Sequence, residues 1–188
     1  VNAEDRYRMI TQFGLGQLTG IQLPGESPGI LSSPDTWDGR TYYTTMFGQG
    51  YAINAVQGAV IAATLGNGGV RLQPTIVSGT TSEDGVFTPI DRPAPLEVVR
   101  PEVAQTVVKM LESVTAPGST GELAGVDGYR VAAKTGTAEI GDGGTIANMV
   151  ALFPAENPQI AISVVLYRPS YLHLAGESAA PLVQQIVL

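Results

Sequence analysis

The stretch from Arg130 to Ile140, Arg-Val-Ala-Ala-Lys-Thr-Gly-Thr-Ala-Glu-Ile, has the pattern of a buried strand with a lysine in its middle. A charged side chain inside such a strand costs free energy unless it is paired or used. Gly136 marks a point where another backbone or a ligand comes close. Because strand side chains alternate between the two faces of a sheet, the hydroxyls of Thr135 and Thr137 share one face. With Lys134, these residues predict a small anion-binding surface on a strand edge.

The same residues permit a second interpretation. A lysine can also extend to solvent beside a turn glycine, and a motif as short as Lys-Thr-Gly recurs by chance. The choice between an anion-binding surface and a solvent-exposed lysine therefore depends on the rest of the sequence.

The composition is typical of a globular chain and excludes several classes of function. The 188 residues are 44% hydrophobic and 14% charged, enough for one domain or a large part of one. A net charge of −7 without a basic stripe argues against a nucleic-acid partner. The absence of cysteine and the single histidine, His173, argue against thiolate and multi-histidine metal sites. Neither of these two kinds of metal site is therefore expected.

No apolar run reaches the length of a transmembrane helix, and no signal peptide opens the chain. If the protein works outside the cytoplasm, we expect its anchor upstream of Val1.

Hydrophobic periodicity predicts helices at residues 4–13, 53–65, 101–114 and 178–188. The helix at 53–65 is apolar almost all round and is therefore expected to be buried at the centre of the domain. Its polar exceptions are Asn54 and Gln57. In the last helix, the large apolar residues are expected to face the sheet: Leu182, Val183, Ile186 and Val187.

Besides 130–140, strands are predicted at residues 71–77, 146–153 and 159–167. The turn-rich segment 78–96 is expected to form an excursion or a hairpin with a mobile tip. A glycine-rich turn at 141–144 predicts a second hairpin after the lysine strand. The run Ile160–Leu166 is apolar on both faces, which favours a strand covered on both sides.

This order of elements predicts an α+β fold in which helices lie on both sides of an antiparallel sheet. The strand that carries Lys134 is expected near one edge, where its backbone can pair with an extended ligand.

Several segments, taken in order, resemble the C-terminal half of the transpeptidase domain of class B penicillin-binding proteins, most closely the septal, cell-division type. The resemblance covers nearly the whole chain, and it rests on the order and spacing of the segments rather than on any single one. It implies the penicillin-binding transpeptidase fold, which serine β-lactamases share, with residues 1–188 as the C-terminal part of the domain. The segments are Gln12-Phe13-Gly14-Leu15-Gly16, Leu23-Pro24-Gly25-Glu26, Phe47-Gly48-Gln49-Gly50-Tyr51, Asn67-Gly68-Gly69 and Lys134-Thr135-Gly136-Thr137-Ala138.

The resemblance also implies roles for the motif. Lys134 would hold the carboxylate of a stem peptide or of a β-lactam, and the hydroxyls of Thr135 and Thr137 would share it. The backbone N–H of Thr137 would form one half of an oxyanion hole. Gly136 would let substrate lie along the strand edge.

The chain departs from the family pattern at the nucleophile. The family also uses Ser-x-x-Lys and Ser-x-Asn, and neither motif is present. The nearest approach is Thr106-Val-Val-Lys109, where Thr106 is expected to be a helix-surface residue. We therefore expect the nucleophilic serine upstream of Val1, so that this chain does not perform acyl transfer alone.

The resemblance implies a D,D-transpeptidase that cross-links peptidoglycan stem peptides at D-Ala-D-Ala and is a target of β-lactams. It also implies that the reaction needs no metal and no organic cofactor. It implies the upstream part of the same protein and division-machinery proteins as partners, and a site at the outer face of the cell membrane. Two alternatives stay open: a serine β-lactamase, and a non-catalytic penicillin-binding sensor or division assembly module. Outside the motif, His173 is expected in a loop, and Glu139 lines the cleft or is a solvated strand residue.

Overall fold

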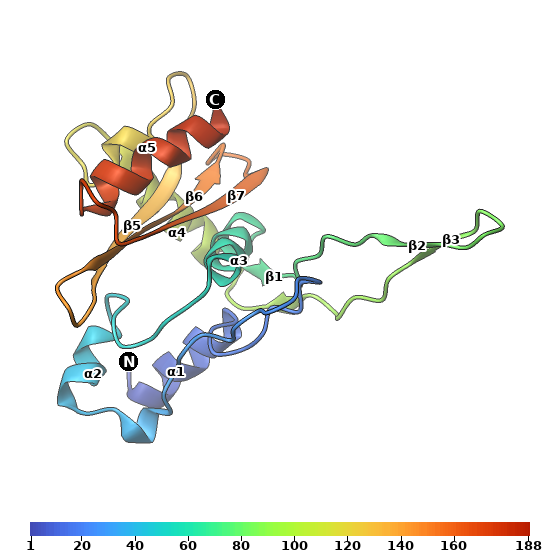
Figure 1. Cartoon of the computed structure of the whole chain (residues 1–188), viewed down its shortest axis with the longest axis horizontal. Helices are drawn as coiled ribbons and strands as arrows, with labels where there is room; N and C mark the ends of the chain where they lie inside the picture. Colours follow the sequence, from blue (N-terminus) through green and yellow to red (C-terminus); the bar gives the residue numbers. More distant parts are fainter.

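The computed structural model describes all 188 residues, whose core is a sheet with helices on both faces (Figure 1). The sheet is antiparallel, in the order β5 (Ala132–Glu139), β6 (Thr145–Phe153) and β7 (Ile160–Tyr167). Helix α5 (Ala175–Val187) covers one face, and α3 (Ala55–Gly66) covers the other, with α4 (Pro101–Glu112) beside it. The predicted α+β arrangement is confirmed, and β5 lies at an edge of this sheet as expected.

The strand register divides the core into two parts. Ala132 to Glu139 on β5 face Leu152 to Thr145 on β6, one residue opposite one. Since side chains alternate along a strand, neighbouring residues enter different cores. The larger core lies under α5 and includes Ala133, Met149 and Val164, whereas the smaller one lies under α3 and α4 and includes Ala132 and Leu152.

Helix α3 confirms the prediction of a buried central helix. Asn54 begins it with a capping box, because its side chain accepts from the Gln57 N–H and the Gln57 side chain accepts from the Asn54 N–H. Gly58 lets the helix approach β7 closely, since an added Cβ would lie 2.6 Å from the Ser163 hydroxyl oxygen. The polar exception Gln57 is only 1% exposed, and its Nε2 donates to the carbonyls of Gln17 at 2.8 Å and Pro28 at 2.9 Å.

We expect Gln57→Leu to destabilise the protein by about 1–3 kcal/mol, because it leaves these part-buried carbonyls and the Asn54 N–H without their partner. Urea unfolding measures the change. Gln105→Leu, at an exposed position of α4, is the control and should shift the free energy of unfolding by only a few tenths of a kcal/mol. Equal effects of the two variants would contradict the role of Gln57.

The N-terminal segment forms a small subassembly beside the sheet. It contains α1 (Ala3–Gln12), the 3-10 turn η1 (Pro34–Thr36) and α2 (Gly39–Thr44). Arg6 on α1 donates to the Tyr42 carbonyl and the Thr45 hydroxyl, which ties α1 to α2. Trp37 packs edge-on against Tyr7, with ring centroids 6.4 Å apart.

The segment between α3 and α4 forms an arm that extends far from the body (Figure 1). Its base is the pair β1 (Val70–Arg71) and β4 (Leu96–Glu97), and further out β2 (Gly79–Thr81) pairs with β3 (Phe87–Pro89). The hairpin prediction is confirmed. The strand predicted over 71–77 is wrong, because only Val70 and Arg71 pair, and Pro74 lacks the N–H that a longer ladder would need.

Two predictions about burial are also corrected. Ile186 is 58% exposed and faces away from the sheet, whereas Ala175, Ala179 and Val183 form the buried face of α5. The middle of β7 is covered on both sides, but Val165 near its end is 46% exposed.

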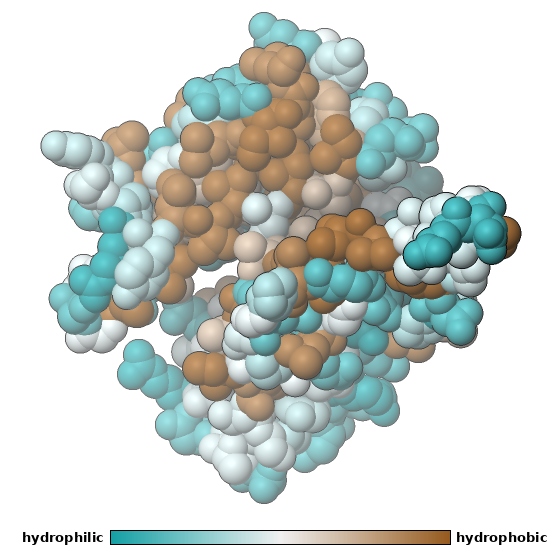
Figure 2. Space-filling view, turned by 45° about the vertical axis from the view of Figure 1, so that its right-hand side comes forward, coloured by the Kyte–Doolittle hydropathy of each residue, from teal (hydrophilic) through white to brown (hydrophobic).

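Figure 2 shows hydrophobic residues gathered on the face of the body above the arm, and hydrophilic residues at the tip of the arm. No helix combines the length and the apolar character that crossing a membrane would require. The remaining short 3-10 turns are η2 (Ser113–Thr115) and η3 (Glu122–Ala124).

Candidate active site

The outer edge of β5 is the candidate site, and α4 fixes its beginning. Arg130, just before β5, makes a two-pronged ion pair with Glu112 of α4, with both nitrogen–oxygen distances at 2.7 Å. Hydrogen bonding to Glu112 and the charge of that carboxylate raise the pKa of Arg130. The Thr115 hydroxyl also donates to the Val131 carbonyl at 2.8 Å. These contacts hold the first residues of the strand, while the edge further along stays open.

The backbone direction along this edge follows from its hydrogen bonds. The Val131 carbonyl accepts from the Thr115 hydroxyl, and the Thr135 carbonyl accepts from the Lys134 ammonium group of the same strand. Toward β6, by contrast, the N–H of Ile140 donates to the Gly144 carbonyl. In an antiparallel strand, alternate residues point their N–H and C=O groups the same way. The N–H of Thr137 therefore also points to the open edge, where it can donate to a ligand.

Lys134 is exposed rather than buried, which corrects the expectation from its apolar neighbours. Its ammonium group donates to the Thr135 carbonyl at 2.7 Å and forms no ion pair. Val131, Ala132 and Ala133, by contrast, are at most 3% exposed. The strand thus leaves the core at Lys134 and places an unpaired positive charge on its open edge.

Thr135 and Thr137 share one face of β5, as predicted, and it is the face that α5 covers. The Thr135 hydroxyl lies 3.4 Å from the hydroxyl of Thr120. Thr135 and Thr137 line a cavity of about 370 Å³ beside the start of α5. Lys134 belongs to the opposite face by alternation. The ammonium and the two hydroxyls therefore do not form one flat surface, and Lys134 reaches the edge only through its long side chain.

The hydroxyl of Thr137 has a hydrogen-bond partner that the sequence did not suggest. The backbone N–H of Ala175, the first residue of α5, donates to the Thr137 hydroxyl oxygen at 3.0 Å. Residue 174, the N-cap position, is a leucine and provides no side-chain cap. Thr137 thus caps a helix that lies 38 positions away in sequence. Because its oxygen accepts from α5, its hydroxyl hydrogen is free to donate elsewhere.

Ala175→Pro removes this contact and suits the helix, since proline is favoured at the first helical position. Leu174 before it is extended (φ −80°, ψ 137°), which proline requires of its neighbour. Because Ala175 is only 1% exposed, we expect the larger proline ring to lower the thermal midpoint. Since the resemblance implies that β-lactams acylate the full-length protein, we also expect benzylpenicillin to acylate the variant about tenfold more slowly, because the Thr137 hydroxyl is displaced. Thr137→Ala should slow acylation similarly, and adding Ala175→Pro to it should have no further effect. A further loss in the double variant would contradict the contact's role.

The space next to Gly136, where a side chain would lie, is occupied by Asn148, a residue that sequence reasoning missed. The two lie opposite each other on β5 and β6. A Cβ added at Gly136 would lie 2.5 Å from Asn148 Oδ1 and 2.9 Å from its Nδ2. Only the register reveals this contact, because nothing in the sequence around Asn148 marks it.

The other candidates lie outside this arrangement. Thr106 donates its hydroxyl to the Glu102 carbonyl of the same helix at 2.7 Å, as expected for a helix-surface residue. Glu139 is exposed at the end of β5, and His173 is exposed in the loop before α5. Asp142 in the β5–β6 turn pairs with Arg168 at the end of β7.

Comparison with known proteins identifies the family to which this chain belongs. The model of the penicillin-binding protein transpeptidase domain matches residues 1–188, and the chain belongs to that family.

Individual relatives agree with this assignment. Penicillin-binding protein PbpB of Mycolicibacterium smegmatis is 35% identical over 202 residues, which cover 99% of this chain and 31% of that protein. Peptidoglycan D,D-transpeptidase FtsI of Escherichia coli is 35% identical over 185 residues, covering 94% of this chain and 30% of FtsI. The chain therefore spans about a third of the length of these relatives.

Solved structures give the same result. The crystal structure of penicillin-binding protein 3 from Mycobacterium tuberculosis superposes with a TM-score of 0.89 at 36% identity, covering 96% of this chain and 44% of that one. The same protein has been crystallised in complexes with aztreonam and with ampicillin. The expected transpeptidase fold is confirmed.

Proposed function

We propose that the protein containing this chain is a peptidoglycan D,D-transpeptidase, which cross-links stem peptides at D-Ala-D-Ala and is acylated by β-lactams. The observation that carries the proposal is the family match over residues 1–188, with Lys-Thr-Gly-Thr on the open edge of β5. The relatives named as D,D-transpeptidase or as penicillin-binding protein support it. In this proposal residues 1–188 form the C-terminal part of the catalytic domain, and the nucleophilic serine lies upstream.

In the proposed reaction the serine oxygen attacks the penultimate carbonyl, and the peptide bond to the last D-Ala breaks. D-Ala leaves as an amine, and the amine of a neighbouring stem then displaces the serine from the acyl group. Lys134 supplies positive charge for the terminal carboxylate. The Thr137 N–H donates to the oxyanion that develops on the attacked carbonyl. The Thr137 hydroxyl hydrogen, free of α5, donates to the same carboxylate as Lys134.

The substrate would lie along β5 as an added strand, because the edge offers backbone N–H and C=O groups that no other strand uses. We further propose division-machinery proteins as partners and the outer face of the cell membrane as the location, because the resemblance to the septal type implies both. A serine β-lactamase or a non-catalytic penicillin-binding module are the competing functions, and the names of the relatives favour the transpeptidase over both.

The test is to incubate the full-length protein with a fluorescent penicillin, to map the labelled peptide and to follow its release. We expect label on a serine upstream of Val1 that persists for hours. Release within milliseconds would instead identify a β-lactamase. A folded full-length protein that acquires no label would leave the non-catalytic module as the function.

A further inference from the structure

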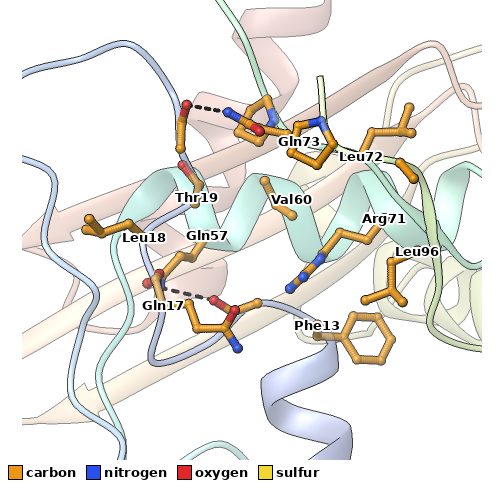
Figure 3. Close-up of a pocket in the computed structure, with 15 residues that line it drawn as sticks. Phe13, Gln17, Leu18, Thr19, Gln57, Val60, Arg71, Leu72, Gln73 and Leu96 are labelled. Atoms are coloured by element: carbon orange, nitrogen blue, oxygen red, sulfur yellow. Dashed lines mark hydrogen bonds between the residues drawn. The ribbon is translucent and has the colours of Figure 1, made fainter. Parts of the chain in front are cut away.

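A cavity of about 260 Å³ lies where the base of the arm meets the N-terminal segment (Figure 3). The end of α1, the following loop, α3 and the paired strands β1 and β4 all contribute to its wall. Much of this wall is apolar, from residues such as Phe13, Val60, Leu72 and Leu96. Its volume is just below that of pockets that hold drug-sized molecules, so it suits a smaller one.

Arg71 of β1 extends into this cavity, and its guanidinium group points toward the end that Gln17 and Phe13 line (Figure 3). The group packs closely on the backbone at Gly14, where an added Cβ would lie 2.7 Å from Arg71 Nη1. The side chain is half-buried, and this burial lowers the pKa of Arg71. No carboxylate lies within ion-pair distance of it.

The hydrogen bonds of Arg71 within the chain do not account for its position. Its one bond, from Nη1 to the Thr11 carbonyl, is 3.4 Å long, at the weak end of the range. That carbonyl lies near the end of α1, whose last turn has no basic residue, so Arg71 offers it some compensation. An arginine has several N–H donors in a planar fork, and most of those of Arg71 have no partner in the chain.

Glu26, which contacts the cavity-lining residue Thr19, is not the partner of Arg71. Glu26 accepts from the N–H of Thr19 at 2.8 Å and from its hydroxyl at 2.6 Å, and it forms no ion pair with Arg71. Gln73, at another wall, donates its amide to the Gly20 carbonyl at 2.7 Å. The cavity therefore combines apolar walls with one cationic fork whose donors are free.

We propose that this cavity binds a small organic carboxylate, with its charged end on the Arg71 fork and its apolar body against the walls. A carboxylate matches the spacing of the guanidinium donors and can accept two hydrogen bonds at once. The ligand carries a single negative charge, because only one cation faces the cavity. The site lies at the joint between arm and body, so an occupant contacts both.

The test titrates the full-length protein with phenylacetate and with phenylacetamide, which has nearly the same shape but no charge. Calorimetry gives the affinities, and protein NMR locates the signals that shift. We expect phenylacetate to bind about tenfold or more tightly than phenylacetamide, with shifts around Phe13, Val60 and Leu72. Arg71→Gln should reduce phenylacetate binding to the level of the amide. The control Arg40→Gln, which removes an exposed arginine on α2, should leave both affinities unchanged.

Arg71→Lys keeps the charge but loses the planar fork, so we expect an affinity between those of the wild type and Arg71→Gln. If Arg71→Gln does not fold, the affinity of Arg71→Lys for phenylacetate tests the role of Arg71 instead. The proposal is overturned if phenylacetate shows no saturable binding, if the amide binds equally well, or if a folded Arg71 variant binds phenylacetate as the wild type does.

Discussion

Lys134→Ala should slow acylation of the full-length protein by benzylpenicillin about a hundredfold or more. The structure gives the reason: Lys134 places an unpaired ammonium group on the open edge of β5, where it meets only the Thr135 carbonyl. Removing a cation that holds a carboxylate through a charge-assisted hydrogen bond costs a few kcal/mol, which corresponds to this change in rate. Stopped-flow measurement of the second-order acylation rate constant checks it.

The chain offers a matched control, because Lys109 is its only other lysine and lies exposed on α4. Lys109→Ala should acylate at the wild-type rate. The methyl ester of benzylpenicillin adds a second control, since it lacks the carboxylate. The gap between wild type and Lys134→Ala should shrink severalfold with the ester. An undiminished gap would mean that Lys134 acts on something other than the carboxylate, and an unchanged rate with benzylpenicillin would remove Lys134 from the site.

Gly136→Ala should lower stability by about 1 kcal/mol or less, because the clash is with the end of the half-buried Asn148 side chain, and it should lower acylation by about tenfold or more. The added Cβ would lie 2.5 Å from Asn148 Oδ1, so that strand β5 or the Asn148 side chain has to move. Thermal unfolding and the acylation rate constant measure the two effects. Both arise next to Lys134 and Thr137, where small shifts of the backbone misplace reacting groups.

The double variant Gly136→Ala with Asn148→Ala separates two causes. If the missing side chain at residue 136 makes room for Asn148, removing the amide should restore both the stability and most of the acylation rate. If the space instead belongs to the substrate, stability recovers while acylation stays low. We expect the first outcome. The second would mean that Gly136 makes room for substrate along the strand edge, as the sequence alone indicated.

The sequence predicted the three strands of the main sheet and their order well because their signals are local, whereas the strand predicted over 71–77 was wrong. The apolar run before Lys134, the glycine-rich turn after Ile140 and the apolar stretch of β7 each fix one element. The rotation of α5 was predicted wrongly at Ile186 because its buried face consists mainly of alanines, such as Ala175 and Ala179. Small residues give a weak hydrophobic signal, although they let the helix lie close to the sheet.

The candidate site was predicted in its residues but not in its contacts. Lys134 and the two threonines lie on β5 as expected, yet alternation places the lysine and the threonines on opposite faces, and the ammonium group reaches the edge only through its long side chain. The partners Asn148 and Ala175 lie on other elements, at positions fixed only by strand register and by helix docking. No local pattern in a sequence encodes such long-range pairs.

The arm between α3 and α4 differs from the rest of the molecule in what holds it together. Its outer strands pair over only three residues each, whereas β5 and β6 pair over eight. Phe87 of β3 and Val86 just before it are both exposed. An isolated two-stranded hairpin is marginally stable. Opening it therefore costs far less free energy than opening the sheet. In deuterated water, we therefore expect the amide hydrogens of β2 and β3 to exchange through this local opening, and those of the central strand β6 to exchange only on global unfolding.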